Sequence, residues 1–220
     1  MTKPAIIRTD FPDSQYVQEK TRKTQIVLHH TVSGPGVSGD IGWWKSTSER
    51  VATHFVIDRE GLIYQLFDLE HWAWHLGLTN AHFQKAHVPY RKLDPTSVGI
   101  EIDSWGFMEK RADGTFTPWG MAGKARPVPA DKVHEYCAAN LWRGKQYYEK
   151  YTPAQINALA KLLPWLCSEL GIPKQYNVDM WGLSANALLG KPGIWTHASY
   201  RPDKSDCHPQ PELCKMLQNL

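Results

Sequence analysis

Short apolar runs, separated by glycine, proline and polar clusters, dominate the pattern of this chain and are typical of buried strands. Three consecutive apolar residues starting at Ile26 predict a strand over 24–30 that is covered on both faces. A similar run predicts a core strand over 98–102. Residues 54–58 and 62–66 are expected to form a hairpin, because a glycine closes the short segment between them.

One segment has the period of a helix instead. Thr152 can cap the start of a helix and Gly171 its end. Between them, apolar residues recur every three or four positions: Ile156, Leu159, Leu163, Leu166 and Leu170. Shorter helices are expected over about 40–49 and after Pro209. Together these elements predict a single α/β domain with a central mixed β-sheet flanked by helices.

The rest of the chain is expected to be less regular. Residues 1–23 are polar and predict an N-terminal arm, followed by one domain over 24–220. Within that domain, glycines and prolines over about 106–150 indicate an insertion made of loops, with a short helix near 130–141. Residues 174–193 are expected to be a long loop.

Composition limits the class of protein. A net charge of +3 without a basic run argues against nucleic acid as a partner. No run is long enough to span a membrane, and the N-terminus lacks the apolar stretch of a signal peptide. We therefore expect synthesis in the cytoplasm, no membrane insertion and a monomer. The four cysteines form no Cys-x-x-Cys pair, so a disulfide framework is not indicated.

The candidate chemistry lies where three strands end. His29 and His197 each end an apolar strand, and Glu101 lies in the strand over 98–102. Two imidazoles and one acidic or thiolate side chain can hold a zinc ion, and zinc with a nearby carboxylate is typical of a hydrolase. The candidates for the third ligand are Asp206, Cys207 and His208. Only one of them is expected to bind, because adjacent side chains cannot all point at one ion.

Roles follow for the neighbouring side chains. A buried Glu101 is costly unless it has a partner or a task, and here it can act as a general base. Lys204 can stabilise an oxyanion. His30 should face away from His29, because side chains alternate along a strand. His54 and His75 are expected to line the cleft.

Four segments in this order resemble the type 2 N-acetylmuramoyl-L-alanine amidases. They are Ile-Val-Leu-His-His-Thr at 26–31, Ala-Thr-His-Phe-Val-Ile-Asp-Arg-Glu-Gly at 52–61, Ser-Val-Gly-Ile-Glu-Ile at 97–102, and His197 followed by Lys-Ser-Asp at 204–206. The family includes phage lysins and bacterial cell-wall amidases, and peptidoglycan recognition proteins are similar in fold. The resemblance covers about 25–210, apart from the insertion and the long loop.

The resemblance implies a zinc hydrolase that cuts the amide between N-acetylmuramic acid and L-alanine in peptidoglycan. It implies His29 and His197 as zinc ligands, with Glu101 and Lys204 as catalytic residues. The lysine spacing implies Asp206 as the third ligand. In the family, however, proline follows this ligand at once, and anchoring on Pro209 would select His208 instead.

The alternatives are a non-catalytic peptidoglycan-binding module and a zinc peptidase acting on the stem peptide. Retention of both histidines and of Glu101 argues against the first, and the absence of His-Glu-x-x-His argues against the second. The biological setting stays open between a phage lysin, a cytosolic recycling enzyme and an exported effector. Thr53 stands where the family has tyrosine.

Overall fold

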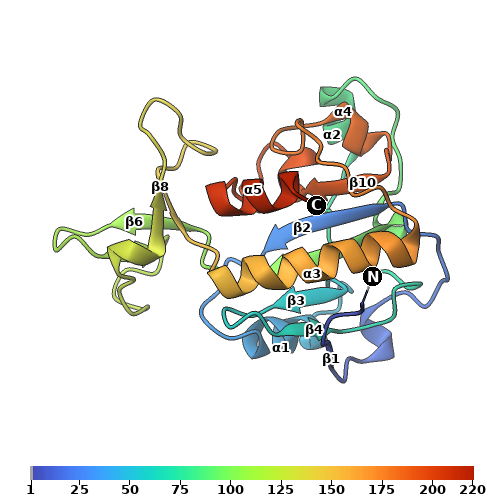
Figure 1. Ribbon diagram of the computed structural model, residues 1–220, viewed down its shortest axis with the longest axis horizontal. Coiled ribbons are helices and arrows are strands. Elements are labelled where there is room, and N and C mark those ends of the chain that lie inside the picture. Colours follow the sequence, from blue (N-terminus) through green and yellow to red (C-terminus); the bar gives the residue numbers. More distant parts are fainter. Residues whose placement is uncertain (1) are drawn as a thin grey trace.

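Six strands form one mixed sheet in the order β1-β4-β3-β5-β2-β10 (Figure 1). The computed structural model describes residues 2–220. The strands are β1 Ile7–Arg8, β2 Gln25–His30, β3 Phe55–Ile57, β4 Ile63–Gln65, β5 Ser97–Ile102 and β10 Gly193–Thr196. Neighbours are parallel except for the hairpin of β3 and β4. The predicted mixed sheet, its core strands and its hairpin are confirmed.

Helices cover this sheet, and α3 Pro153–Leu170 is the longest in the described chain (Figure 1). Thr152 and Gln155 form a capping box at its start, and Gly171 ends it at a left-handed φ of 66°. Its apolar face packs into the same core cluster as β2 and β5. The other helices are α1 Ser38–Ser46, α2 Asn80–Lys85, α4 Ala185–Leu188 and α5 Pro211–Gln218. The α/β prediction is therefore confirmed.

The segment over 106–150 is more regular than expected. It forms a second, antiparallel sheet in the order β7-β6-β9-β8, which stands beside the main body in Figure 1. Its strands are β6 Phe107–Lys110, β7 Phe116–Pro118, β8 Val133–Glu135 and β9 Tyr147–Glu149. The helix predicted near 130–141 was wrong. Only the 3₁₀ turn Ala130–Lys132 forms, and β8 then pairs with β9 and buries Val133 in a small apolar cluster.

Two other irregular predictions also need correction. The N-terminal arm contributes β1, which pairs with β4 and forms one edge of the sheet, so the backbone of the arm is partly in the sheet. The long loop over 174–193 contains α4, whose start is capped by the Ser184 side chain. Among residues 2–220, no helix has both the length and the apolar character needed to cross a membrane.

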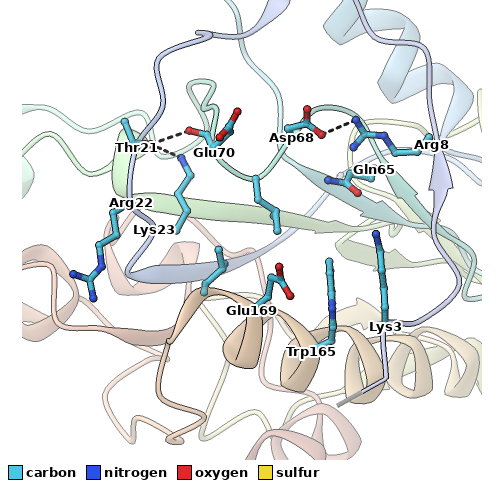
Figure 2. A pocket seen from close by; sticks show the side chains of 12 residues that line it. Lys3, Arg8, Thr21, Arg22, Lys23, Gln65, Asp68, Glu70, Trp165 and Glu169 are labelled. Carbon is cyan, nitrogen blue, oxygen red and sulfur yellow. Dashed lines mark hydrogen bonds and ion pairs between the residues drawn. The ribbon is translucent and has the colours of Figure 1, made fainter.

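A cavity of about 580 Å³ lies between the N-terminal arm, β4 and α3 (Figure 2). Lys23 on its wall is buried, and its Nζ donates to Thr21 Oγ1 at 2.8 Å and to the carbonyl of Pro95 at 2.7 Å. Lys23 lies two residues before the start of β2, whereas His29 lies near the other end of that strand. The cavity is therefore remote from the predicted chemistry.

Candidate active site

Strand register brings the three predicted strand-end residues together. β2 pairs in parallel with β5 so that His29 lies opposite Glu101. On its other side β2 pairs with β10, whose last residue, Thr196, lies opposite Leu28. His197 follows directly, at the start of a 3₁₀ turn. Paired residues of parallel strands share one face of the sheet. The two histidines and the glutamate therefore meet on one face, near the carboxyl ends of the three strands.

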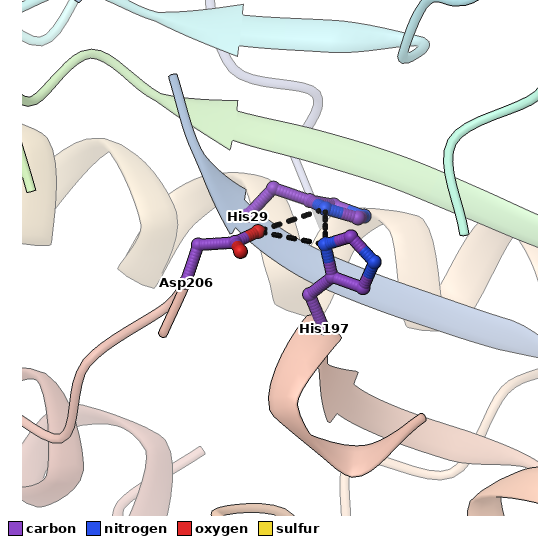
Figure 3. A group of neighbouring side chains, drawn as sticks. All are labelled: His29, His197 and Asp206. Carbon is purple, nitrogen blue, oxygen red and sulfur yellow. Dashed lines mark hydrogen bonds and ion pairs between the residues drawn. The ribbon is translucent and has the colours of Figure 1, made fainter. Parts of the chain in front are cut away.

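The two histidines converge with one carboxylate (Figure 3). His29 Nδ1 and His197 Nδ1 lie 3.0 Å apart, and Asp206 Oδ2 lies 3.2 Å from the first and 2.8 Å from the second. The three atoms that could bind a metal ion, one from each residue, all fall within 4.8 Å of one another. The side chains are nearly enclosed, with exposed fractions of 2%, 5% and 7% for His29, His197 and Asp206.

Hydrogen bonds fix which ring nitrogen of His197 faces the carboxylate. His197 Nε2 lies 3.0 Å from the carbonyl of Leu76, which can only accept. This contact assigns the proton to Nε2, and in the neutral ring Nδ1 is then unprotonated.

His29 is fixed through a longer chain. Ser97 donates its hydroxyl proton to the Leu93 carbonyl at 3.0 Å, so its oxygen accepts from His75 Nε2 at 2.8 Å. A neutral His75 then presents bare Nδ1, which accepts from His29 Nε2 at 3.0 Å. His29 Nδ1 is consequently unprotonated as well.

Asp94 holds the segment that supplies both contacts. Its Oδ1 accepts from the backbone N–H of His75 at 2.8 Å and of Leu76 at 2.9 Å. The close packing also needs Gly99, because a Cβ there would lie 3.1 Å from His75 Nδ1 and 2.7 Å from Thr53. Asp94 was missed by sequence reasoning, since an aspartate before proline indicates only a turn.

The charges of the three residues suit a cation. Burial, followed by the neighbouring His197, lowers the pKa of His29 to about 4, so its ring is neutral at pH 7. Burial alone would raise the pKa of Asp206, but His197 and His29 hold it well below its ordinary value. Two imidazole nitrogens and a carboxylate thus converge on one point, an arrangement that a bound cation would stabilise.

Glu101 is an acid of perturbed pKa beside this group. Burial, with a smaller contribution from Asp206, raises its pKa well above the ordinary value. Its Oε2 is enclosed and has no hydrogen-bond partner within residues 2–220. Lys204 is half-buried, and its charge lowers the pKa of both Glu101 and His29. An enclosed carboxyl oxygen without a partner is costly and indicates a functional role.

His208 and Cys207 lie away from the group. Both ring nitrogens of His208 are engaged, Nδ1 with Tyr136 Oη at 2.9 Å and Nε2 with the carbonyl of Glu149 at 3.0 Å. The Cys207 thiol is buried against the carbonyl of His208. The backbone direction after Asp206 decides between these neighbours, and only Asp206 turns toward the two histidines.

Three other histidines were singled out by the sequence. His30 faces Tyr151, with Nδ1 2.8 Å from the phenol oxygen, as expected from strand alternation. His75 lies against His29, with the ring nitrogens Nδ1 and Nε2 3.0 Å apart. The expectation for His54 was wrong: its Nε2 contacts the carbonyl of His71 at 2.9 Å and its Nδ1 accepts from the Gly99 N–H at 3.3 Å. His54 therefore joins core elements.

Solved structures of similar fold are amidases and endolysins. The structure named PlyL has a TM-score of 0.56 at 14% identity, covering 98% of this chain and 96% of its own. The PlyG catalytic domain gives 0.55 at 16%, covering 98% and 93%. The N-acetylmuramoyl-L-alanine amidase LysC from Clostridium intestinale URNW gives 0.52 at 13%, covering 99% and 97%. At these identities the likeness shows the fold alone.

The fold thus defines an α/β protein of the amidase type. The sequence model of the N-acetylmuramoyl-L-alanine amidase family matches residues 19–211, and the chain belongs to this family. No curated protein sequence gave a match. The family resemblance inferred from the four sequence motifs is therefore confirmed, and membership supports peptidoglycan amidase activity.

Proposed function

We propose that the protein is a zinc-dependent amidase that hydrolyses the bond between N-acetylmuramic acid and L-alanine in peptidoglycan. The observation that carries this proposal is the convergence of His29, His197 and Asp206 on one point, while the second nitrogen of each ring contacts His75 or the carbonyl of Leu76. Family membership supports the substrate class. The proposed site of action is the cell wall for a lytic enzyme, or the cytosol for an enzyme that recycles wall fragments.

His29, His197 and Asp206 would hold the ion, and the donor set fits zinc. Zinc commonly takes imidazole nitrogen and carboxylate oxygen, and catalytic sites supply three protein ligands. The hydrogen bonds to Leu76 and His75 orient the rings as metal-binding histidines require. When bound, zinc supplies Lewis-acid chemistry: it polarises a carbonyl and lowers the pKa of water.

Glu101 and Lys204 would handle the proton and the developing charge. The Glu101 carboxylate takes a proton from the attacking water and passes it to the nitrogen of the leaving L-alanine. A raised pKa brings this group nearer to the working pH, which suits a base that must later act as an acid. The Lys204 ammonium stabilises the oxyanion on the attacked carbonyl.

The test is digestion of purified peptidoglycan with zinc-loaded protein, followed by mass spectrometry of the products. We expect free stem peptides that begin with L-alanine, and loss of activity on chelation that added zinc restores. Cuts within the stem peptide would instead identify a peptidase. Binding to the wall without any released fragment, by protein of full zinc content, would identify a binding module.

A further inference from the structure

The insertion over 106–150 touches the chain segment that carries two of the proposed site residues. Residues 198–206 run from the end of β10 past Lys204 to Asp206, and beyond the 3₁₀ turn at their start they form no helix or strand. An irregular segment of this kind leaves backbone carbonyls that need donors. The insertion supplies them from a single turn.

That turn consists of residues 142–145. The backbone N–H of Trp142 donates to the carbonyl of Lys145 at 3.1 Å, and the reverse bond is 2.9 Å. Its two central residues, Arg143 and Gly144, have φ values of 49° and 75°, as in the tight turns of hairpins. Tyr148 of β9 donates its hydroxyl to the carbonyl of Trp142 at 3.1 Å, which ties the turn to the second sheet.

Two side chains of the turn reach three carbonyls of the ligand-bearing segment. Trp142 Nε1 donates to the carbonyl of Ser205 at 2.8 Å. The Arg143 guanidinium donates to the carbonyls of Pro202 at 3.1 Å and Ala198 at 3.2 Å. Ser205 lies between Lys204 and Asp206, and Ala198 follows His197. The contacts therefore lie on both sides of Lys204 and directly beside His197 and Asp206 in the chain.

The conformation of Arg143 supports a dedicated role. A left-handed φ disfavours any residue with a Cβ, and glycine or asparagine is the usual solution at such a position. Arg143 adopts this unfavourable conformation, and its planar guanidinium donates to two carbonyls. A turn needed only for its shape would gain nothing from arginine.

We propose that Trp142 and Arg143 are positioning residues that hold the segment 198–206 so that Asp206 and Lys204 face the two histidines. The inference rests on the proposed function for the roles of Asp206 and Lys204. It gives the insertion a role in the site, because two of its side chains support the segment 198–206 from outside the metal centre. We call Trp142 and Arg143 the brace. Asp206 is also tied within the segment, because the Ala198 N–H donates to its carbonyl at 3.1 Å.

The test uses Arg143→Gly, Trp142→Phe and the control Trp119→Phe in the full chain. Glycine suits the left-handed turn, and phenylalanine keeps the ring while removing its N–H, so both variants are designed to preserve the fold. Trp119 is an exposed tryptophan of the same insertion, with an exposed fraction of 60%. Zinc affinity is measured by competition with a chelating dye, and hydrogen exchange over 198–208 is followed in metal-free protein.

We expect each brace variant to weaken zinc binding by about 10-fold, in the range seen when groups that orient metal ligands are lost. Exchange over 198–208 should accelerate, and kcat should fall more than KM rises. The control should match the wild type in zinc affinity and exchange. Unchanged affinity and exchange in both brace variants, or a rise in KM alone, would overturn the proposal.

Hydrogen exchange also separates this inference from the proposed function. If the wild-type protein neither binds zinc nor cleaves peptidoglycan, the proposed function fails. Faster exchange in the brace variants would then still show that the turn restrains the segment, whereas unchanged exchange would reject the brace as well.

Discussion

His29 and Glu101 lie directly opposite each other on the adjacent parallel strands β2 and β5. The pair sets a proposed metal ligand beside the proposed general base with no loop between them. Strands buried on both faces are rigid supports, which suits groups that must keep a fixed separation. The same register explains why two short apolar strands can define one site.

Replacing Glu101 by glutamine should separate catalysis from metal binding. The amide cannot take a proton, so we expect kcat to fall by about 10²–10⁴-fold while zinc content stays at the wild-type value. The pKa of Glu101 is raised in the native state, so ionisation above its unfolded pKa destabilises the native state. Metal-free Glu101→Gln should therefore melt at a higher temperature than the wild type at pH 7.

The measurements are peptidoglycan hydrolysis, zinc content by elemental analysis and thermal denaturation. Wild-type rates in a variant with full zinc content would remove Glu101 from the mechanism. Lost activity together with lost zinc would instead make it a determinant of metal binding.

Asp206 and His208 should respond in opposite ways to substitution. Asp206→Ala removes a carboxylate that lies within 3.2 Å of both histidines, so we expect zinc binding to be lost. His208→Gln breaks contacts with Tyr136 and the Glu149 carbonyl, so we expect a lower melting temperature. Its zinc affinity should stay within about threefold of the wild type at temperatures where it is folded.

Calorimetric titration of zinc into metal-free protein, at a temperature well below the melting transitions, compares the two variants. Retention of zinc by Asp206→Ala and its loss by His208→Gln would reverse the assignment.

His75→Ala should weaken zinc binding without removing a ligand. The substitution deletes the acceptor of His29 Nε2 and leaves that ring free to rotate or change tautomer. Loss of such a contact costs about 10–100-fold in metal affinity. His75→Asn should recover part of the loss, because its amide oxygen lies near the former Nδ1 position. Equal zinc affinity in the wild type and His75→Ala would show that His29 needs no such support.

The sequence predicted the candidate residues at the strand ends more fully than it predicted the irregular segment that supplies the third ligand. His29, Glu101 and His197 could be placed because their strands have unbroken apolar cores, and parallel pairing then aligns their ends. The choice of Asp206 over His208 depends on a backbone direction that is set by tertiary contacts of Tyr151 and Gln210. No periodicity encodes such contacts.

The second sheet was missed for a related reason. Its strands are three or four residues long, too short for alternation to stand out, and glycine-rich turns separate them. Pairing between β6, β7, β8 and β9 stabilises strands that local sequence leaves undecided. The contact of Trp142 with Ser205 joins two irregular segments and has no sequence signature.

Lys23→Met should stabilise the protein at neutral pH, and the gain should shrink as the pH rises. Burial lowers the pKa of Lys23 to about 7, and no carboxylate among residues 2–220 contacts the amine. An unfolded lysine titrates near 10.4, so between about pH 7 and 10 the unfolded chain holds a proton that the native amine has released. Wild-type stability therefore rises with pH through this window, whereas the penalty of a buried charge is complete below it.

Methionine removes the charge but also two hydrogen bonds, so we expect a net gain on the order of 2 kcal/mol at pH 6, less than the full pKa shift implies. Denaturant unfolding of both proteins from pH 6 to pH 10 measures the difference directly. Lys20→Met is the matched control, since Lys20 is exposed and pairs with Glu70 at the surface. A constant difference between wild type and Lys23→Met across this range would mean that Lys23 keeps its proton in the native state, because only deprotonation of the buried amine makes the gain depend on pH.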